Sequence, residues 1–175
     1  MPTYQLISSN TLSSDTMTVT FSSIPQTYTD LLFKLSVRSS EGGFTNDQMR
    51  LRFNGSSATN YNFTLIRGDG SGAALGDSDA SNNAQMIALV NTSASKVATF
   101  SNVDIYIPNY TNTSNQQQIG AMTVMENDTT TAYITTTAGR YANNDAISSV
   151  SFSFPIFNSD FKTYSSFYLY GISNA

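Results

Sequence analysis

The chain has 175 residues, a net charge of −4 and only 11% charged residues. It contains no histidine and no cysteine, which excludes Ser–His–Asp and Cys–His catalysis and disulfide bridges, and argues against a zinc site. Its eight Lys and Arg residues are scattered, whereas nucleic-acid binding needs basic residues that neutralise phosphates, so we expect no nucleic-acid partner.

The length fits a single domain that spans residues 1–175. Hydrophobic residues make up 39% of the chain, with 11 Phe and 10 Tyr, which is enough for a substantial core. Residues 1–4 have neither the basic nor the apolar region of a signal peptide, and no apolar run approaches the ~20 residues of a membrane helix. We therefore expect no membrane partner, and release by host lysis if the protein acts outside a cell.

Alternating apolar and polar residues predict strands along the first part of the chain. The clearest is 31–38, where Leu31, Phe33, Leu35 and Val37 should face a core. Pro25 marks a corner, because proline cannot donate to a sheet ladder. The predicted strands are 4–8, 17–21, 31–38, 48–53 and 61–65, with an Asn54-Gly55 turn before the last.

Residues 68–83 break this alternation, because they are rich in Gly, Ser, Asp and Asn. We expect a long exposed loop here. Asp69, Asp77 and Asp79 gather carboxylate oxygens in this segment, so they are weak candidates for binding calcium. Their spacing matches no EF-hand and lacks a terminal bidentate Glu, so we favour a solvated loop and expect no metal or cofactor.

Strands resume after the predicted loop and continue to the C-terminus. In 97–107, Val103, Ile105 and Ile107 share one face, and in 119–126 we expect Met122 and Val124 to point inward. The predicted strands of this part are 86–90, 97–107, 119–126, 130–140, 150–154 and 165–172. No segment shows sustained helical periodicity. We therefore predict an all-β fold, an antiparallel β-sandwich of roughly ten strands that is jelly-roll-like by strand count.

Few residues could carry chemistry. Glu126 and Asp128 stand at a strand–turn boundary and Asp104 lies mid-strand, but nothing singles out the buried carboxylate pair that acid–base hydrolysis needs. Arg50 and Arg52 lie on the outer face of one strand, where we expect them to meet water or pair with a neighbour. The sequence therefore predicts that the protein is not an enzyme.

Tyrosines offer a second functional hypothesis. Those of the C-terminal half could stack on sugars, or they could pack in the core and between subunits, where tyrosine is also enriched. The candidates are Tyr106, Tyr110, Tyr133, Tyr141, Tyr164, Tyr168 and Tyr170. We take Tyr106, Tyr110, Tyr168 and Tyr170 as the candidate residues of a binding surface.

Several turn and strand-end segments carry a family resemblance. They are Ile24-Pro25-Gln26-Thr27-Tyr28-Thr29-Asp30-Leu31-Leu32, Leu51-Arg52-Phe53-Asn54-Gly55, Ile105-Tyr106-Ile107-Pro108-Asn109-Tyr110, Glu126-Asn127-Asp128-Thr129-Thr130-Thr131-Ala132-Tyr133 and Tyr168-Leu169-Tyr170-Gly171-Ile172. Together they resemble small β-sandwich structural proteins of tailed bacteriophages, including cyanophages, that accompany the capsid or the tail. The resemblance extends from Ile24 to Ile172 and brings no catalytic or binding residues with it.

The resemblance implies a virion protein. The function it suggests first is capsid decoration, in which the protein binds the outside of the head as a cement protein, with the major capsid protein and its own copies, in a homotrimer, as partners. We expect the contact with the shell to involve the termini or the 68–83 loop. The alternative is a tail or head-fibre module that binds a host receptor or glycan, which the Tyr-rich strands and the long loop support.

Overall fold

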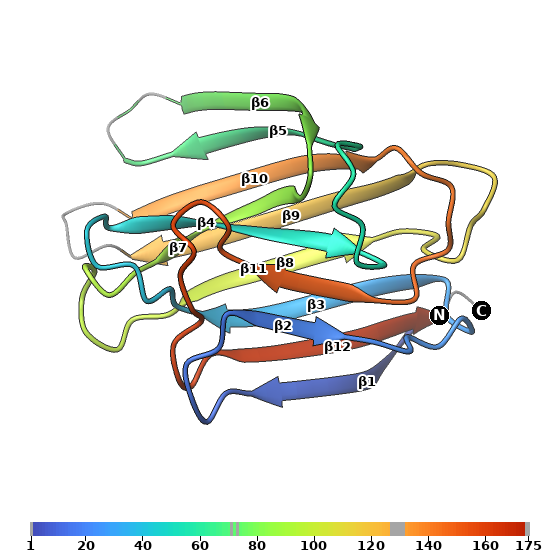
Figure 1. The fold of residues 1–175 in the computed structure, drawn as a ribbon, viewed down its shortest axis with the longest axis horizontal. Helices are drawn as coiled ribbons and strands as arrows, with labels where there is room; N and C mark the ends of the chain where they lie inside the picture. The colour runs from blue at the N-terminus through green and yellow to red at the C-terminus, as the bar shows by residue number, and fades with distance from the viewer. Residues whose placement is uncertain (1, 71, 73, 127–131, 174–175) are drawn as a thin grey trace.

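Figure 1 shows the computed structural model of the chain, which describes residues 2–70, 72, 74–126 and 132–173. These residues form twelve strands and no helix, and all strand pairs are antiparallel. Within the same residues there is accordingly no helix long and apolar enough to cross a membrane. The predicted all-β antiparallel sandwich is confirmed, with twelve strands where we expected about ten.

The strands are divided between two sheets of unequal size. In Figure 1 the smaller sheet lies in front of the middle of the larger one, and the chain ends lie near each other. The larger sheet has, in order, β1 Thr3–Thr11, β12 Ser166–Ser173, β3 Asp30–Val37, β8 Ser101–Ile107, β9 Gln117–Glu126, β10 Ala132–Tyr141, β5 Tyr61–Gly68 and β6 Ala74–Asn82. The smaller sheet has β2 Thr18–Phe21, β11 Val150–Ser153, β4 Asn46–Phe53 and β7 Gln85–Asn91.

The main core lies between the two sheets and is built largely from Phe rings. The four predicted core residues of β3 are all buried: Leu31, Phe33, Leu35 and Val37. The Phe33 ring contacts Phe21 at 5.6 Å and Phe152 at 5.2 Å between centroids, both edge to face. This geometry is favourable for aromatic pairs, and it joins β3 of the larger sheet to β2 and β11 of the smaller one.

A second apolar cluster covers the outer edge of the smaller sheet. Although β7 is the edge strand, every one of its residues is buried. Its Met86 and Leu89 pack with Phe63 and Leu65 of β5 and with Met125 of β9. The larger sheet therefore extends beyond β7, and its last strands, β5 and β6, overhang the smaller sheet.

The segment 68–83, predicted as a long loop, mostly forms strand β6. It pairs with β5 from Tyr61↔Asn82 to Gly68↔Ala74, with a register shift near Tyr61. Six of the nine residues of β6 are Ala, Gly, Asp or Asn, types that are depleted in strands, and eight of the nine are exposed. Exposure was predicted correctly, but the loop was wrong, because this strand is held by backbone pairing with β5 rather than by burial of its own side chains.

A second correction concerns β9, where Met122 and Val124 point outward. They are 46% and 44% exposed, while Ile119, Ala121 and Met125 are buried. Both faces of this strand carry apolar residues, so the alternation could not by itself decide which face meets the core. The consequence is an apolar surface on the outside of the larger sheet.

Candidate functional site

The outer face of the larger sheet, which we call the outer sheet face, is the candidate binding surface. Successive side chains of a strand point to opposite faces, so register partners on neighbouring strands stand side by side. One row across the sheet is Leu6, Tyr170, Leu32, Tyr106, Gly120 and Ala138. The next row is Ser9, Tyr168, Lys34, Asp104, Met122, Thr136 and Ile66.

Three of the four predicted tyrosines share this face. Tyr106 is 42% exposed and Tyr168 is 38% exposed. Tyr170 is half-buried, and it lies in the same row as Tyr106 and two residues from Tyr168 on β12. Tyr110 does not belong to the surface: it is fully buried, and its hydroxyl donates a hydrogen bond to the carbonyl of Pro25. The chain turns sharply at Asn109, with a φ of 48°, between the end of β8 and this inward-pointing ring.

The remaining tyrosines serve different purposes. Tyr141 is buried and stacks on Tyr61 at 4.6 Å between ring centroids, so it belongs to the core. Tyr133 lies beneath the Arg67 guanidinium, and Tyr164 is 75% exposed with a positive φ of 74°. Tyr110 and Tyr141 thus belong to the core, whereas Tyr106, Tyr168 and Tyr170 lie on the outer sheet face.

Tyr106 is held in place by a buried carboxylate. Its hydroxyl donates to Asp30 Oδ2 at 2.6 Å, and the backbone N–H of Asn109 donates to Asp30 Oδ1 at 2.9 Å. The hydrogen bond to the Asp30 carboxylate raises the pKa of Tyr106 to about 12, so the hydroxyl stays protonated. Its neighbour Gly120 has open space where a Cβ would lie, which leaves the sheet flat beside the exposed ring.

Beyond these tyrosines the outer sheet face carries a group of exposed aliphatic side chains. Its members come from three neighbouring strands, β9, β10 and β5, and are 44–62% exposed: Met122, Val124, Ile134 and Ile66. Between this group and Tyr168 lies one exposed ion pair, in which Lys34 Nζ donates to Asp104 Oδ2 at 2.8 Å. Contiguous exposed apolar side chains of this kind mark interaction surfaces in proteins.

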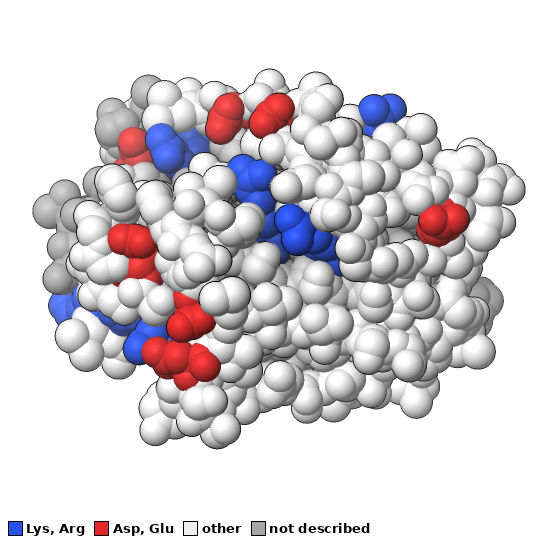
Figure 2. All heavy atoms as spheres, in the orientation of Figure 1, with Lys and Arg blue, Asp and Glu red and all other residues white. Residues whose placement is uncertain are grey.

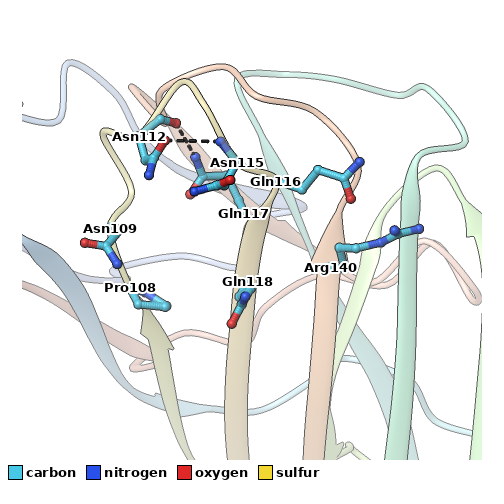
Figure 3. Close-up of a pocket in the computed structure, with 8 residues that line it drawn as sticks. All are labelled: Pro108, Asn109, Asn112, Asn115, Gln116, Gln117, Gln118 and Arg140. Atoms are coloured by element: carbon cyan, nitrogen blue, oxygen red, sulfur yellow. Dashed lines mark hydrogen bonds between the residues drawn. The ribbon is translucent and has the colours of Figure 1, made fainter.

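One end of the outer sheet face is hollowed by a pocket lined mostly with amides, which we call the amide pocket (Figure 3). Gln118 of β9 and Arg140 of β10 are register partners and are both exposed on this face. Gln117 is the first residue of β9, and the connection between β8 and β9 supplies the other side chains. The cavity has a volume of about 490 Å³ and is lined by Pro108, Asn109, Asn112, Asn115, Gln116, Gln117, Gln118 and Arg140.

The connection that forms the amide pocket is held by its own hydrogen bonds. Asn112 Oδ1 accepts from the backbone N–H groups of Ser114 at 2.6 Å and Asn115 at 3.2 Å, and its carbonyl accepts from Gln117 Nε2 at 2.8 Å (Figure 3). These bonds occupy Asn112 and Gln117 in shaping the loop. Amides carry both donors and acceptors, so Gln116 and Gln118 can meet either kind of ligand group.

The predicted calcium candidates do not gather into a metal site. Asp77 and Asp79 lie two residues apart on β6, and Asp69 follows the end of β5. In the described part of the chain, no group of three His, Cys, Asp or Glu side chains is placed to hold a metal ion. Of the other carboxylates, Asp104 pairs with Lys34, Glu126 is exposed, and Asp128 lies outside the described residues.

Comparison with protein-family models, curated proteins and solved structures finds no match to this chain. Sequence reasoning placed Met122 and Val124 in the core and named no candidate residue in the connection between β8 and β9. The signals that could have found them are the apolar residues on both faces of β9 and the run of glutamines at 116–118.

Proposed function

We propose that the protein is a non-enzymatic structural protein of a tailed-phage virion, a capsid decoration protein that binds the outside of the head and stabilises it. The family resemblance from Ile24 to Ile172 suggests the virion. The observation that carries the proposal is the outer sheet face, a broad surface of exposed Tyr, Met, Val and Ile side chains with a single ion pair among them. Tyr and Met are enriched, and charged residues depleted, at the centres of protein interfaces.

The major capsid protein is the proposed partner, and the capsid surface the proposed location. We place the docking surface on the outer sheet face rather than on the termini or residues 68–83. The reason is that the exposed aliphatic side chains lie in the middle of strands, whereas β6 presents mainly Gly, Ser and Asp. A tail location remains the alternative.

A jelly-roll topology and a trimer complete the proposal. Strands β2, β3, β4 and β5 alternate between the two sheets, and the smaller sheet has the order β2-β11-β4-β7, as two interlocked Greek keys would give. On this interpretation the pair β9–β10 is inserted between β8 and β5. A homotrimer would match three-fold positions on a shell, because closed symmetry repeats one interface around an axis.

The test of the proposal uses phage heads assembled with and without the protein. A ligand that binds the assembled shell but not its separated subunits stabilises the shell by mass action. Heads that lack the protein should therefore form but release DNA at a lower temperature than complete heads. Equal release temperatures, with antibody label confined to the tail, would reject decoration.

The amide pocket favours a second function, that of a tail or head-fibre module that binds a glycan. Its volume lies within the range of small-ligand sites, and sugar hydroxyls pair with amides that both donate and accept. The exposed ring of Tyr106 lies one row away on the same face and could stack on a sugar. Under this function a glycan array should show binding that Gln118→Ala abolishes and that Val97→Ala, at an 87% exposed position outside the face, leaves intact.

A further inference from the structure

A groove on the opposite side of the larger sheet holds an unusual concentration of charge. Arg67 of β5 lines it together with Gln48 of β4 and Asp77 of β6, and Leu65, Leu75, Gly76, Met86 and Leu89 complete a cavity of about 340 Å³. It lies where the overhanging β5–β6 pair meets the smaller sheet. We call it the arginine groove.

Arg67 lines the arginine groove, and two further arginines, Arg50 and Arg52, lie on the neighbouring strand β4. Figure 2 shows basic side chains gathered in the middle of this face, over β4, with acidic ones above them. Arg50 donates to Asn82 Oδ1 and to Gln48 Oε1, both at 3.1 Å, and Arg52 Nε donates to the carbonyl of Asn83 at 2.9 Å. These bonds tie β4 to the end of β6, and through Gln48 they connect Arg50 to the lining of the groove.

Three buried donors on this side of the sheet have no acceptor among the described residues, and one of them, Arg67 Nε, belongs to the lining of the arginine groove. Arg67 Nε, Arg50 Nε and Asn82 Nδ2 are buried and make no hydrogen bond within the described residues. The guanidinium carbon of Arg67 lies 5.9 Å from the centre of the Tyr133 ring. This cation–π contact uses the face of the guanidinium and leaves the N–H groups at its edge available. Buried donors without partners are unfavourable, so a ligand that brings acceptors gains directly from pairing with them.

The other residues that line the arginine groove determine which class of ligand fits it. Leu65, Leu75, Met86 and Leu89 offer apolar contact, and Gln48 and Asp77 offer acceptors for hydroxyl groups. Asp79 is near enough to Arg50 to act on its charge, so two carboxylates border the site. A multiply charged anion such as a phosphate would be repelled by them, whereas a single carboxylate fits the planar fork of a guanidinium.

We propose that the arginine groove binds an acidic sugar, with the sugar carboxylate on Arg67 and its hydroxyls on Asp77 and Gln48. The alternative of an acidic peptide is less favoured, because an Asp or Glu side chain carries no hydroxyl beside its carboxylate to reach Asp77. This inference does not rest on the functions proposed for the outer sheet face, which lies on the other side of the same sheet.

The experiment titrates the whole protein with a galacturonic acid trisaccharide and, as matched ligand, its methyl ester, at low salt. Binding is measured by calorimetry and by amide NMR shifts. The acid should bind, the neutral ester should bind about tenfold more weakly or not at all, and shifts should centre on Leu75, Gly76 and Asp77. Equal binding of acid and ester, or no binding of the acid, would overturn the proposal.

Arg67→Gln should weaken binding of the acid about tenfold, and Arg67→Lys should recover only part of the loss, because lysine keeps the charge but not the planar fork. Lys162→Gln, which removes a partly exposed cation that lines neither the arginine groove nor the amide pocket, is the control and should bind as the wild type does. If Arg67→Gln does not fold, the amide shifts of the wild-type protein show whether the acid binds at the arginine groove. Shifts centred on the amide pocket, or binding of a glutamate-rich peptide in place of the sugar, would contradict the assignment.

Discussion

Two glycines show how closely single residues are constrained. At Gly171 in β12, an added Cβ would lie far inside contact distance of the Tyr28 ring, whereas at Gly120 in β9 nothing lies within 4 Å of it. Gly171→Ala should therefore lower the free energy of unfolding by about 1–3 kcal/mol, the range for overpacked sites. Gly120→Ala is the matched control, and its effect should stay within about 0.5 kcal/mol. Urea denaturation of both variants measures the difference, and equal effects would contradict the packing described for Tyr28.

Asp47 supplies a pH-dependent prediction. It is 1% exposed, and Ser39 Oγ and the backbone N–H of Gln48 donate to its carboxylate, each at 2.7 Å. Burial nevertheless dominates and raises the pKa of Asp47 above its ordinary value. The native state then holds a proton that the unfolded chain has already released, so stability falls as pH rises from about 4 through the native pKa.

Asp47→Asn removes this titration, so the stability of the variant relative to wild type should rise between pH 4 and pH 7. Denaturation curves at several pH values measure the trend. Asp15 is the comparison of opposite sign, because hydrogen bonds from Lys162 and Thr163 lower the pKa of that carboxyl. Asp15→Asn should therefore lose relative stability as pH rises through the acidic range. Parallel curves for wild type and Asp47→Asn would contradict the effect of burial.

For single residues, the sequence predicted correctly which side chains are buried only where the other face of the strand is mainly polar. Leu31, Phe33, Leu35 and Val37 alternate with residues of which all but Leu32 are polar, and all four are buried. Met122 alternates with Ala121 and Thr123, so its orientation depends on which partner sheet covers it. Tyr110 was predicted on the surface but is buried, because the turn at Asn109 directs its ring inward. The residue type does not decide between the two positions, since tyrosine has both an apolar ring and a polar hydroxyl.

At the scale of elements, β6 tests what a strand without buried side chains contributes. Replacing residues 72–81 by a short Gly-Ser linker removes backbone pairing with β5 but almost no buried surface. The variant should keep cooperative unfolding and lose less stability than Leu35→Ala, which should cost about 2–5 kcal/mol as other large-to-small core changes do. Circular dichroism and urea denaturation measure both. Loss of the folded state on replacement would show that β6 is required for the core.

The elements themselves were predictable where the apolar pattern was strong. Strands β3, β4, β7 and β12 fall within one or two residues of their predicted bounds, because each has regularly spaced or continuous apolar residues. In contrast, β6 carries Gly76, Asp77 and Asp79 and is a strand only because β5 offers an open edge. The amide pocket was beyond prediction for a related reason. Its floor comes from β9 and β10, whose alignment is a property of the sheet, while its rim comes from a loop.

The two edges of the larger sheet differ in how they meet other molecules. The β6 edge carries Asp77 and Asp79, and like charges oppose pairing with a second copy. The β1 edge, Thr3–Thr11, has no charged residue and is exposed along nearly its whole length. A register shift between Leu6 and Ser8 interrupts its ladder, and such bulges discourage edge-to-edge association. Association of the whole molecule should therefore use a face rather than an edge.

At the scale of the whole molecule, the aliphatic part of the outer sheet face should drive self-association, which leaves the part with Tyr106, Tyr168 and Tyr170 to meet the capsid. A surface of exposed Ile66, Met122, Val124 and Ile134 gains free energy when a second copy covers it, because apolar area leaves water. Under the proposed trimer, light scattering at micromolar concentration should give three times the protomer mass of 19.0 kDa.

Ile134→Lys places a charge in the centre of this surface and should shift the equilibrium to the monomer. Val97→Lys, at an 87% exposed position in the turn before β8, is the control and should leave the mass unchanged. A wild-type protein that stays monomeric would reject the trimer, and an Ile134→Lys protein that still forms trimers would show that the interface lies elsewhere.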